Sequence, residues 1–537
     1  MRRSLPDSES PSASRGSRVT RRSLLRLTAA GAVTIGAGAA LAACGSSADP
    51  SGAPAGGGNP KRGGRLRVGL VGGSAKDTLN AHSPVNHPDQ ARIINLYEGL
   101  ASFDENYQVR MALAESIEPN KEATEWTVRL RDGLEFHDGK TITADDVAFT
   151  FRRITDPKDP QAHAAALATL DRDAIKVMDE RTVRLVFKEP YGELLDEIAE
   201  LANGIVPEGY DPKKPVGSGP FKLQSFTPGE QSVFVRHPNY WREGEPYLDE
   251  LVVIDMPEDT ARVNALLGGQ VDAIDQLPLG QIKVIQANPN LKVLESQTGG
   301  WLPFTMRVDR PPFDDVRVRQ AFRLIVDREE MVRQVLAGHG TVGNDLYGRF
   351  DPNYARELPQ RKQDIAQAKA LLKQAGKENL TVELVTGPIA TGVVEAAQVF
   401  AQQAKAAGVT VNVRKVPEGE FFGDNYLKWD FAQDFWITRN FLPQVANGTE
   451  PGAPYNETHW ADKEFLELVR EARRTLDPAK RAELVKAAQK IEYERGGYII
   501  WGFPNQVDAH GTKIQGIISN KTGLPLNAYG FRKVWMA

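Results

Sequence analysis

The sequence contains almost no cysteine. Cys44 is the single cysteine among 537 residues, so the chain can form no intramolecular disulfide. A protein without disulfides depends on its buried apolar core for stability. A chain of this length is long enough for two or three domains with large cores.

Catalytic signatures are also missing. The sequence has no Gly-x-Ser-x-Gly elbow and no Walker A loop. Ser74 and Lys76 are too close together for a Ser-x-x-Lys motif. The eight histidines are scattered, and the nearest pair, His82 and His87, lies in a proline-containing loop without other ligand types. A zinc site needs three or four ligands. We therefore predict a protein that is not an enzyme and has no metal site and no cofactor.

The sequence has no excess of positive charge outside its first residues. The formal net charge is −4 for the whole chain. Residues 1–43 carry seven arginines and two acids, a charge of +5, so the remainder carries about −9. This acidic body argues against nucleic acid as a partner, and against anionic lipid as a direct ligand.

Long apolar runs are absent except for residues 27–43, "LTAAGAVTIGAGAALAA". This run is shorter than the roughly 20 residues that a spanning helix needs. It follows the basic stretch "TRRSLLR", which contains Arg21 and Arg22, and it ends in "LAAC" at Cys44. A basic region, a modest apolar region and a small-residue junction are typical of an export signal. The alternative is a single-pass anchor in which the cysteine is incidental.

The paired arginines resemble the twin-arginine export signal, and "LAAC" resembles the lipobox of bacterial lipoproteins. The resemblance implies that residues 1–43 are a signal peptide and that Cys44 carries lipid. Each buried lipid methylene contributes about 0.8 kcal/mol, so two or more chains hold a soluble domain at a membrane. We therefore expect an extracytoplasmic protein anchored to the bacterial cell membrane. The Gly-, Ser- and Pro-rich segment 44–64 is then a flexible tether.

The first half of the chain predicts strands and hairpins. Residues 64–73 alternate and end in glycines, like a strand that runs into a loop. Alternation on both sides of Asp132-Gly133 predicts a hairpin, and a helix follows at 144–154 with Thr143 as its N-cap. A second hairpin is predicted over 174–187, and a helix over 193–201.

The second half has a different pattern. Residues 379–387, 392–408 and 409–416 read as strand, helix and strand, which predicts a parallel βαβ unit. Helices are predicted over 462–495 and an apolar strand over 498–503. Hairpins early and a βαβ unit late indicate an α/β chain with at least two lobes.

Tryptophan is concentrated in the second half of the chain. Binding sites are often concave and aromatic, although most single tryptophans belong to a core. The stretch 429–443, "WDFAQDFWITRNFLP", differs from the others because an apolar run ends at Trp436 and polar residues follow. This order predicts a strand that carries polar side chains into a loop, where ligands bind in open α/β sheets.

Several stretches together resemble the extracytoplasmic solute-binding proteins of the peptide, nickel and oligopeptide class (family 5), which serve ATP-driven importers. They include "NLYEGL", "WTVRLRDGLEFHDGKTITADDVAFTFRRI", "VGSGPFKL", "HPNYWREGEPYLDELVV", "RVNALLGGQVDAI" and "PPFDDVRVRQAFRLIVDREEMV". Most of these stretches belong to the structural framework of the fold, so they are specific for the family and much less specific for the ligand. In the last of them, Asp314 or Asp315 is a plausible helix N-cap.

The resemblance implies a two-lobed, periplasmic-binding-protein-like α/β fold with mixed sheets, hinge strands and an extra subdomain in lobe I. The lobes close on a ligand by a hinge motion. Lobe I is expected to comprise 65–83, 216–300 and 504–537, with 84–215 as the extra subdomain. Lobe II is expected to comprise 301–503, with hinge strands near 301–308 and 498–503.

The ligand residues that the resemblance implies carry over only in part. In peptide-binding members, a tryptophan matched by Trp436 is followed three residues later by an aspartate that pairs with the peptide amino group. Here that position is Arg439, which would repel an ammonium group and could instead hold a carboxylate or phosphate. Asp434 is a candidate replacement, although its side chain could lie on the other face. Equally, Arg439 could point to solvent or pair with a nearby acid.

Further cleft residues are expected from both lobes. Val85 and Asn86 lie in a loop that matches the cleft-lining region of relatives, and Gly73 and Ser74 end the first strand. The first crossing strand would bring two more residues to the same cleft. These are Trp301 and Thr305.

The sequence therefore predicts a monomeric solute-binding lipoprotein that delivers a small solute, most plausibly a peptide or peptide-like compound, to an ABC permease. An opine, an oligosaccharide or a metal chelate would fit the same fold. A cell-envelope hydrolase and a signalling receptor are the other classes that stay open.

Overall fold

A computed structural model describes residues 59–537. The predicted export and lipidation residues Arg21, Arg22 and Cys44 lie outside this range. The described part of the chain is a mixed α/β protein with several sheets. It contains no helix with the length and apolarity needed to span a bilayer.

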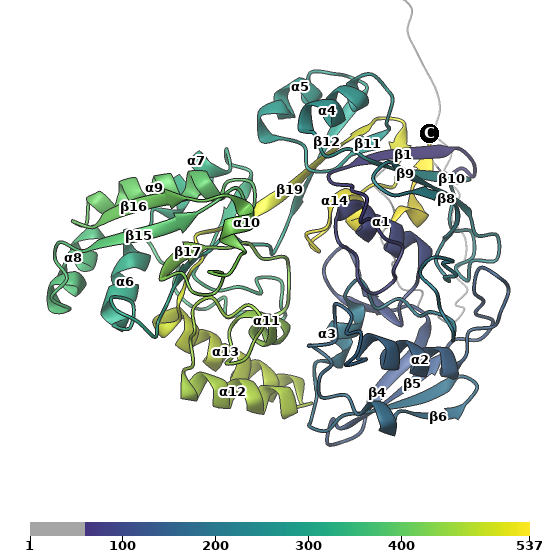
Figure 1. The fold of residues 1–537 in the computed structure, drawn as a ribbon, viewed down its shortest axis with the longest axis horizontal. Coiled ribbons are helices and arrows are strands. Elements are labelled where there is room, and N and C mark those ends of the chain that lie inside the picture. The colour runs from purple at the N-terminus through teal and green to yellow at the C-terminus, as the bar shows by residue number, and fades with distance from the viewer. Residues whose placement is uncertain (1–58) are drawn as a thin grey trace, which may run out of the picture. The chain divides into compact units, whose positions relative to one another are not determined.

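The large mixed sheet has eight strands: seven, in the order β12-β19-β11-β1-β10-β9-β8, form the sheet of lobe I, and the eighth, β14, pairs with β19 from lobe II (Figure 1). The central strand β1 runs parallel to β10 and β11, and the other pairs are antiparallel. The strands are β1 (Arg65–Leu70), β8 (Phe221–Thr227), β9 (Gln231–Arg236), β10 (Glu250–Asp255), β11 (Ala273–Ile274), β12 (Leu291–Gln297), β14 (Gly340–Val342) and β19 (Gly502–Gly511).

The predicted strand at 64–73 is confirmed as β1. Leu66, Val68 and Leu70 are completely buried and share one core with α1 (His87–Leu96) and with the C-terminal segment that contains α14 (Pro525–Ala528). The helices α4 (Asp259–Leu267) and α5 (Ile282–Gln286) form a separate core with residues of β11 and β19. A small ribbon of β20 (Ile514–Gln515) and β21 (Trp535–Met536) belongs to the C-terminal segment.

A second, four-stranded antiparallel sheet lies within 84–215, in the order β4-β5-β7-β6. The predicted hairpin at 174–187 is confirmed as β6 and β7, and the predicted helix at 193–201 as α3. The elements are β2 (Ala101–Phe103), β3 (Val109–Met111), β4 (Ala114–Pro119), β5 (Glu125–Leu130), α2 (Ala144–Ile154), β6 (Lys176–Asp179), β7 (Thr182–Val186) and α3 (Leu194–Ala199).

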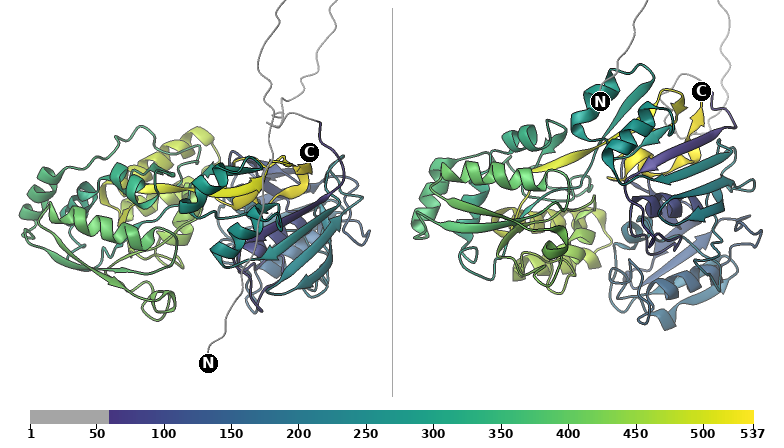
Figure 2. Two further views of the ribbon diagram at one scale, coloured as in Figure 1. Left: turned by 90° about the horizontal axis from the view of Figure 1, so that it is seen from above. Right: turned by 45° about the horizontal axis from the view of Figure 1, so that its top comes forward.

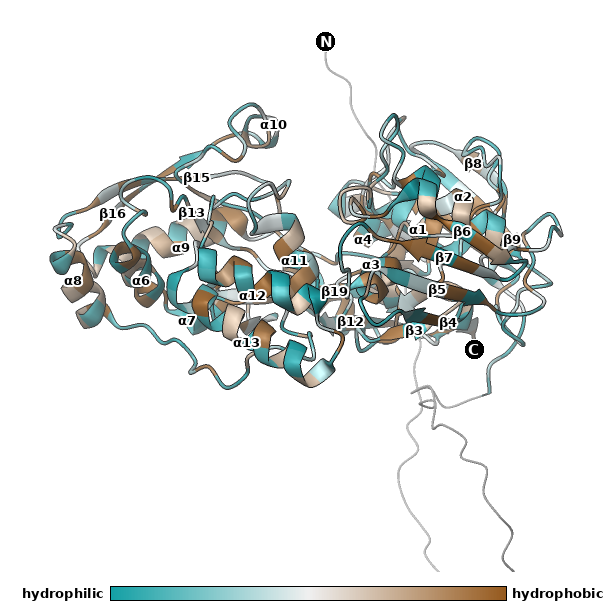
Figure 3. Ribbon diagram, turned by 90° about the horizontal axis from the view of Figure 1, so that it is seen from below, coloured by the Kyte–Doolittle hydropathy of each residue, from teal (hydrophilic) through white to brown (hydrophobic). Residues whose placement is uncertain are grey.

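The hairpin predicted around Asp132-Gly133 is wrong. β5 pairs with β4 on one side and β7 on the other, and not with the residues that follow the turn. The turn is real, since Gly133 has a positive φ of 70°. The local hairpin of β5 is formed with the preceding strand β4, and its other partner, β7, comes from a distant part of the chain; these strands form one core with α2, and Figure 3 shows the hydrophobic residues of β5 and β7.

Helix α2 starts as the sequence predicts. Thr143 and Asp146 form a capping box, in which Asp146 Oδ2 accepts hydrogen bonds from the Thr143 backbone N–H and hydroxyl. The helix then buries Val147, Phe151 and Ile154 on one face. The local signal was sufficient here because both capping partners lie within one turn.

Lobe II contains two small sheets. β13 (Phe304–Met306) lies between β17 (Phe431–Gln433) and β18 (Tyr498–Ile499), all antiparallel. The predicted βαβ unit is confirmed, since β15 (Thr381–Thr386) pairs in parallel with β16 (Thr410–Lys415) and α9 (Val393–Lys405) connects them. The other helices are α6 (Val316–Ile325), α7 (Arg328–Val335), α8 (Ile365–Gln374), α10 (Glu418–Phe421), α11 (Phe441–Gly448), α12 (Lys463–Arg474) and α13 (Pro478–Arg495).

Other predicted features of lobe II have mixed outcomes. Asp315 caps α6 by accepting a hydrogen bond from Arg317 N, as expected. The helices predicted over 462–495 are α12 and α13. By contrast, 498–503 is not one strand, because residues 500–501 separate β18 from β19.

The two lobes are connected through the strands at the edge of the large sheet. The long strand β19 pairs with β12 along its length and, at its first residues, with β14 of lobe II (Figure 2). The lobe boundaries and hinge positions given above stay predictions.

Candidate ligand-binding site

The segment after β17 is extended, and its side chains alternate between the interior and the surface. It is held by an antiparallel bridge between Trp436 and Trp301, whose backbones exchange hydrogen bonds of 2.9 and 3.0 Å. The buried side chains are those of Asp434, Trp436 and Thr438, and the exposed ones are those of Phe435 and Ile437. The predicted site residues Asp434 and Trp436 therefore lie on the same, buried face of the segment.

Two of the predicted aromatic site residues form part of the lobe II core. Trp436 stacks on Trp301 with ring centroids 5.7 Å apart, and Trp301 also stacks on Tyr347. Trp301 is completely enclosed, whereas Trp436 retains a small exposed edge beside Tyr455. The indole N–H of Trp436 is buried and has no hydrogen-bond partner among the described residues. Trp436 can therefore contact a ligand by one edge, and Trp301 supports it from behind.

Exposed aromatic and aliphatic side chains gather around Trp436. Phe435, Ile437 and Tyr455 expose 42%, 43% and 45% of their surface, and Phe422 exposes 37%. Phe422 lies edge-on to Phe435, with centroids 6.3 Å apart. We call Phe422, Phe435, Ile437 and Tyr455 the aromatic patch. Several large apolar side chains exposed together mark a surface that binds something.

Beneath this patch lie two buried acids, Asp434 and Glu457, which we call the acid pair. Burial raises the pKa of both carboxyl groups, and the raised pKa of Glu457 is increased further by the charge of Asp434. Tyr426 donates its hydroxyl hydrogen to Asp434 Oδ2 (2.9 Å), and Tyr498 Oη lies 2.5 Å from Glu457 Oε2. No Lys or Arg of the described chain forms an ion pair with either acid.

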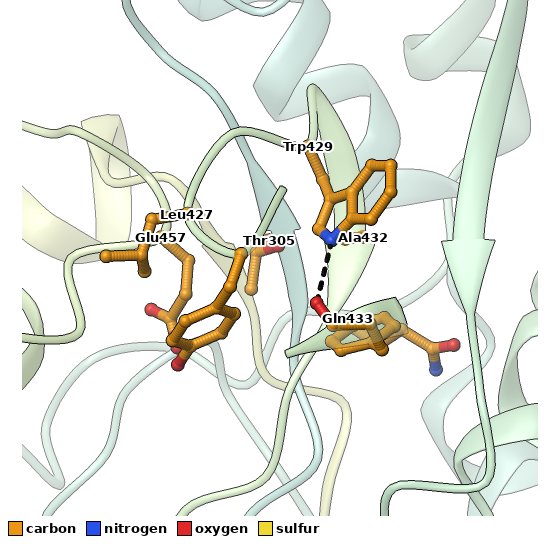
Figure 4. Close-up of a pocket in the computed structure, with 8 residues that line it drawn as sticks. Thr305, Leu427, Trp429, Ala432, Gln433 and Glu457 are labelled. Carbon is orange, nitrogen blue, oxygen red and sulfur yellow. Dashed lines mark hydrogen bonds between the residues drawn. The ribbon is translucent and has the colours of Figure 1, made fainter. Parts of the chain in front are cut away.

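A small cavity of about 10 Å³ adjoins the acid pair. Thr305 of β13, one of the predicted residues, lies between Glu457 and Trp429 in Figure 4. The buried carboxyl group of Glu457 is hydrogen-bonded to that of Asp434. The lining residues are Thr305, Phe421, Tyr426, Leu427, Trp429, Ala432, Gln433 and Glu457. Three of them, Tyr426, Leu427 and Trp429, are half-exposed, so the cavity lies near the surface.

Arg439 is half-buried and lies near the subdomain of lobe I. Burial raises the pKa of Glu200, and the positive charge of Arg439 opposes that rise. Tyr107 Oη lies 2.9 Å from Glu200 Oε1 and 3.1 Å from the carbonyl oxygen of Thr438. No carboxylate of the described residues lies within ion-pair distance of Arg439. The guanidinium thus has an acid in its vicinity without a direct ion pair.

The predicted residues of lobe I converge on Asp77. Asp77 Oδ1 accepts hydrogen bonds from Ser74 N and Asn86 Nδ2, both at 2.8 Å. Gly73 has a φ of +109°, and a Cβ there would lie 2.3 Å from Asp255 Cβ, so only glycine fits. Gly73, Ser74 and Asn86 therefore shape the loop. Val85 differs, because 66% of its surface is exposed.

Behind this loop lies a second buried group of acids, the Arg92 cluster. The Arg92 guanidinium contacts Asp77 (3.0 Å), Asp89 (2.8 Å) and Asp255 (2.5 Å), and all four side chains are fully buried. Burial alone would raise the pKa of Asp77, but hydrogen bonds from Asp255, Asn86 and Arg92 outweigh it and lower the pKa to about 2. Burial raises the pKa of Asp255 to about 6.

Sequence reasoning missed Glu457, Tyr426 and most of the aromatic patch. Phe435 and Ile437 could have been found, because the side chains of a strand alternate and these two flank Trp436. Glu457 lies in a loop between α11 and α12, and no local pattern marks it. No group of three or more His, Cys, Asp or Glu residues in the described part of the chain is arranged to hold a metal ion.

Solved structures with this architecture are periplasmic binding proteins of the two-lobed type, so the fold defines this class. They include the periplasmic binding protein AgaA with agropinic acid from A. tumefaciens R10 (TM-score 0.74, 24% identity, 88% of this chain and 99% of that one). Helicobacter pylori DppA with the peptide STSA gives a TM-score of 0.73, with 21% identity over 89% of this chain and 98% of that one. These likenesses establish the two-lobed fold that the sequence predicted.

The chain belongs to the bacterial extracellular solute-binding proteins, family 5, whose middle-region model matches residues 108–457. Among curated relatives, di/tripeptide-binding protein 2 of Pseudomonas aeruginosa is 27% identical over 481 residues, covering 82% of this chain and 89% of that protein. The glutathione-binding protein GsiB of Escherichia coli K12 is 24% identical over 471 residues, covering 83% and 90%. The family resemblance found in the sequence is thereby confirmed.

Proposed function

We propose that this chain captures a small peptide or peptide-like solute between its lobes and delivers it to an ABC permease. The aromatic patch is the observation that carries this proposal. Phe422 lies against Phe435, Ile437 is exposed two residues further along the segment, and Tyr455 lies edge-on to Trp436. Ligand sites are apolar surfaces with a few polar groups placed among them. The acid pair and Arg439 supply polar groups of both signs next to this patch. Relatives named for binding dipeptides, tripeptides and glutathione favour the same solute class.

The proposal is tested by titrating the purified protein with di- and tripeptides and following tryptophan fluorescence and heat. We expect saturable binding, with at least a tenfold loss of affinity in a Phe435→Ser/Ile437→Ser variant. The matched control is Val284→Ser, which removes a side chain of similar exposure from α5 of lobe I. Binding that is equal in all three proteins would remove the aromatic patch from the site.

An acidic solute such as an opine is a second candidate, and Arg439 favours it. A half-buried guanidinium without a direct ion pair can hold a carboxylate by two parallel hydrogen bonds. Arg439→Ala should then weaken binding of anionic solutes by tenfold or more and leave neutral ones unchanged. Equal affinity for both kinds of solute in this variant would exclude the second candidate.

We also propose that the protein is monomeric and is anchored outside the cytoplasm by lipid on Cys44, after removal of residues 1–43. The basic stretch with Arg21 and Arg22 and the "LAAC" junction support this. Mass spectrometry of the protein from its own host tests the anchor. A first residue of Cys44 with added acyl mass is expected, and an unmodified Cys44 within a longer chain would contradict the proposal.

A further inference from the structure

The segment that precedes α3 contacts the end of α12, so the subdomain within 84–215 meets lobe II at this point. The N–H of Gly192 donates a hydrogen bond to the carbonyl oxygen of Arg473 (2.9 Å), and Arg481 Nη2 donates one to the carbonyl oxygen of Gly192 (3.0 Å). Arg473 also forms an ion pair with Glu193, in which Nε lies 2.9 Å from Oε1. We call Gly192, Glu193, Arg473 and Arg481 the α3–α12 contact.

The chain itself does not bring these two segments together. Gly192 and Arg481 are 289 positions apart in the sequence, and the strands that connect the lobes lie at the edge of the large sheet. Neither side of the contact belongs to those strands. The contact therefore depends on how the lobes are placed and is lost when they separate.

Helix α3 presents acids toward lobe II. Leu194 and Ile198 are buried in the core of the subdomain. Asp196 Oδ1 accepts a hydrogen bond from Asn440 Nδ2 (3.0 Å) at the start of α11. Together with the ion pair of Glu193, this bond joins an acidic helix face to N–H donors of lobe II, so the two surfaces are complementary.

The polar character of this interface allows it to break. Interfaces between domains of one chain are more polar than permanent ones and resemble those of transient complexes. A polar helix face is also the face that a surface helix presents to water, so the acids of α3 need no cover. On lobe II, Arg473 has a second ion pair with Glu450 (Nη1 to Oε2, 2.8 Å), which stays in place when Glu193 leaves. Separation therefore leaves neither charge alone in an apolar core.

We propose that the α3–α12 contact is a latch, which forms when the lobes close, breaks when they open, and shifts the equilibrium between the two states toward the closed one. None of its four residues belongs to the aromatic patch or lines the cavity beside Thr305. The inference goes beyond the proposed function, because it assigns part of the free energy of closure to residues that do not select the solute. A contact that favours the closed state lowers the cost of closing for every solute alike.

Gly192 provides a variant that tests the latch without disturbing either lobe. Its φ does not lie in the positive range, so alanine can adopt its backbone conformation. A Cβ at this position would lie 2.7 Å from the Arg473 carbonyl oxygen and closer still to Arg481 Nη2, and its three nearest atoms all belong to lobe II. Gly192→Ala is thus obstructed only in the closed arrangement. Gly280→Ala of lobe I, where no atom lies within 4 Å of the added carbon, is the matched control.

The first experiment measures the distance between spin labels on the two lobes by double electron–electron resonance. The labels are carried by Met178→Cys of β6 and Val413→Cys of β16, both exposed, in a chain with Cys44→Ser. Spectra are recorded without solute, in buffer and in about 1 M sucrose, which favours compact states. We expect a short and a long distance in wild type. The ratio of short to long should fall at least tenfold in Gly192→Ala and stay unchanged in Gly280→Ala.

Two results would overturn the latch. One is an equal ratio of the two distances in wild type and in Gly192→Ala. The other is a wild type that shows only the long distance in both solutions, because the contact would then hold nothing closed. Both results are independent of which solute the protein binds.

A double-mutant cycle on the same labelled chain tests the ion pair. Glu193→Gln and Arg473→Gln should each lower the ratio of closed to open protein, and the double variant should lower it no further than the more harmful single change. Lys480→Gln, which removes the exposed ion pair with Glu471 inside lobe II, is the control and should leave the ratio unchanged. Fully additive effects of the two changes would overturn the role of the ion pair in the latch.

Titration with di- and tripeptides keeps this inference apart from the proposed function. Gly192→Ala should weaken the binding of every peptide by the same factor of at least ten, because the latch does not touch the solute. An effect confined to some peptides would contradict the latch and place Gly192 in the site. Absence of peptide binding by wild type would contradict the proposed solute class, and the spin-label distances would still decide on the latch.

Discussion

Both lobes bury carboxylates close together, but the two groups are compensated differently. In the Arg92 cluster of lobe I, one guanidinium lies among three aspartates and makes a hydrogen bond to each. In the acid pair of lobe II, the two carboxyl groups are hydrogen-bonded to each other, to tyrosine hydroxyls and to one backbone N–H, and no arginine or lysine of the described residues pairs with them. We call the first group complete, because it contains a base, and the second incomplete, because it contains none.

The comparison also applies to the predicted site residues. Ser74 and Asn86 donate hydrogen bonds to Asp77, and Gly73 lies against Asp255, so these three residues fix the shape of the loop beside the complete cluster. Asp434 is a member of the incomplete pair, and its two oxygens accept hydrogen bonds from Tyr426 and from the Phe435 N–H. Predicted site residues of both lobes therefore adjoin buried acids, with a base beside them in lobe I and without one in lobe II.

The largest expected effect comes from removing the base of the complete cluster. Arg92→Met leaves three buried aspartates without their guanidinium, and breaking a buried ion pair costs about 3 to 5 kcal/mol. Denaturant unfolding should show a loss of this size. Arg65→Met, which removes the exposed ion pair with Glu250, is the control and should change the free energy by about 1 kcal/mol or less. Equal losses in both variants would contradict the contrast between complete and exposed groups.

A smaller effect of the opposite sign is expected in the incomplete pair. The pKa of Glu457 is raised in the folded state, so the folded protein holds a proton that the unfolded chain releases as the pH rises above about 4.3. The stability of wild type should therefore fall as the pH rises. Glu457→Gln removes this fall and should be more stable than wild type by about 1 to 3 kcal/mol at pH 8, with little difference at pH 4. A destabilised variant at pH 8 would show that the carboxylate is compensated.

The opposite pH dependence is expected for Asp77. Its pKa is lowered to about 2, so its contribution to stability is complete above the unfolded value near 3.9 and is lost as the pH falls toward 2. The destabilisation caused by Asp77→Asn should therefore shrink between pH 5 and pH 3. Thermal unfolding over this range measures it, and a constant difference would show that Asp77 acts through its shape and not through its charge.

The smallest effect is expected from the hydroxyl of Tyr426. Tyr426→Phe removes one hydrogen bond to Asp434, which is worth about 0.5 to 1.5 kcal/mol. Denaturant unfolding should show a loss of this size. Tyr493→Phe, which removes a hydroxyl bonded to the Pro359 carbonyl at the surface, is the control and should lose less. Equal losses in the two variants would contradict the role given to the buried hydrogen bond.

The sequence predicts local structure well where all of its determinants are near one another. The capping box of α2 and the βαβ unit of β15, α9 and β16 are of this kind. The hairpin at Asp132-Gly133 failed because one edge of β5 is taken by the preceding strand β4 and the other by β7, which is distant in the sequence. A turn residue fixes the direction of the chain, but the pairing of a strand depends on which distant apolar face it can cover.

The same distinction applies to the site. Trp436 and Asp434 could be found because both lie in one apolar stretch that is visible in the sequence. The role of Glu457 could not be found from the sequence. It depends on the fold, which places the loop after α11 against β17, and on the absence of an arginine or lysine beside this carboxyl group. That absence is a property of the packed interior, and a sequence does not reveal which of its many arginines and lysines will be near.

The central proposal is that this chain captures a small peptide or peptide-like solute. Native mass spectrometry of the protein purified from its own host tests this proposal most directly. The account predicts a mass excess of one small peptide or peptide-like molecule, and the loss of that molecule in Phe435→Ser/Ile437→Ser. A co-purifying molecule of another class, or one retained in full by the variant, would contradict it.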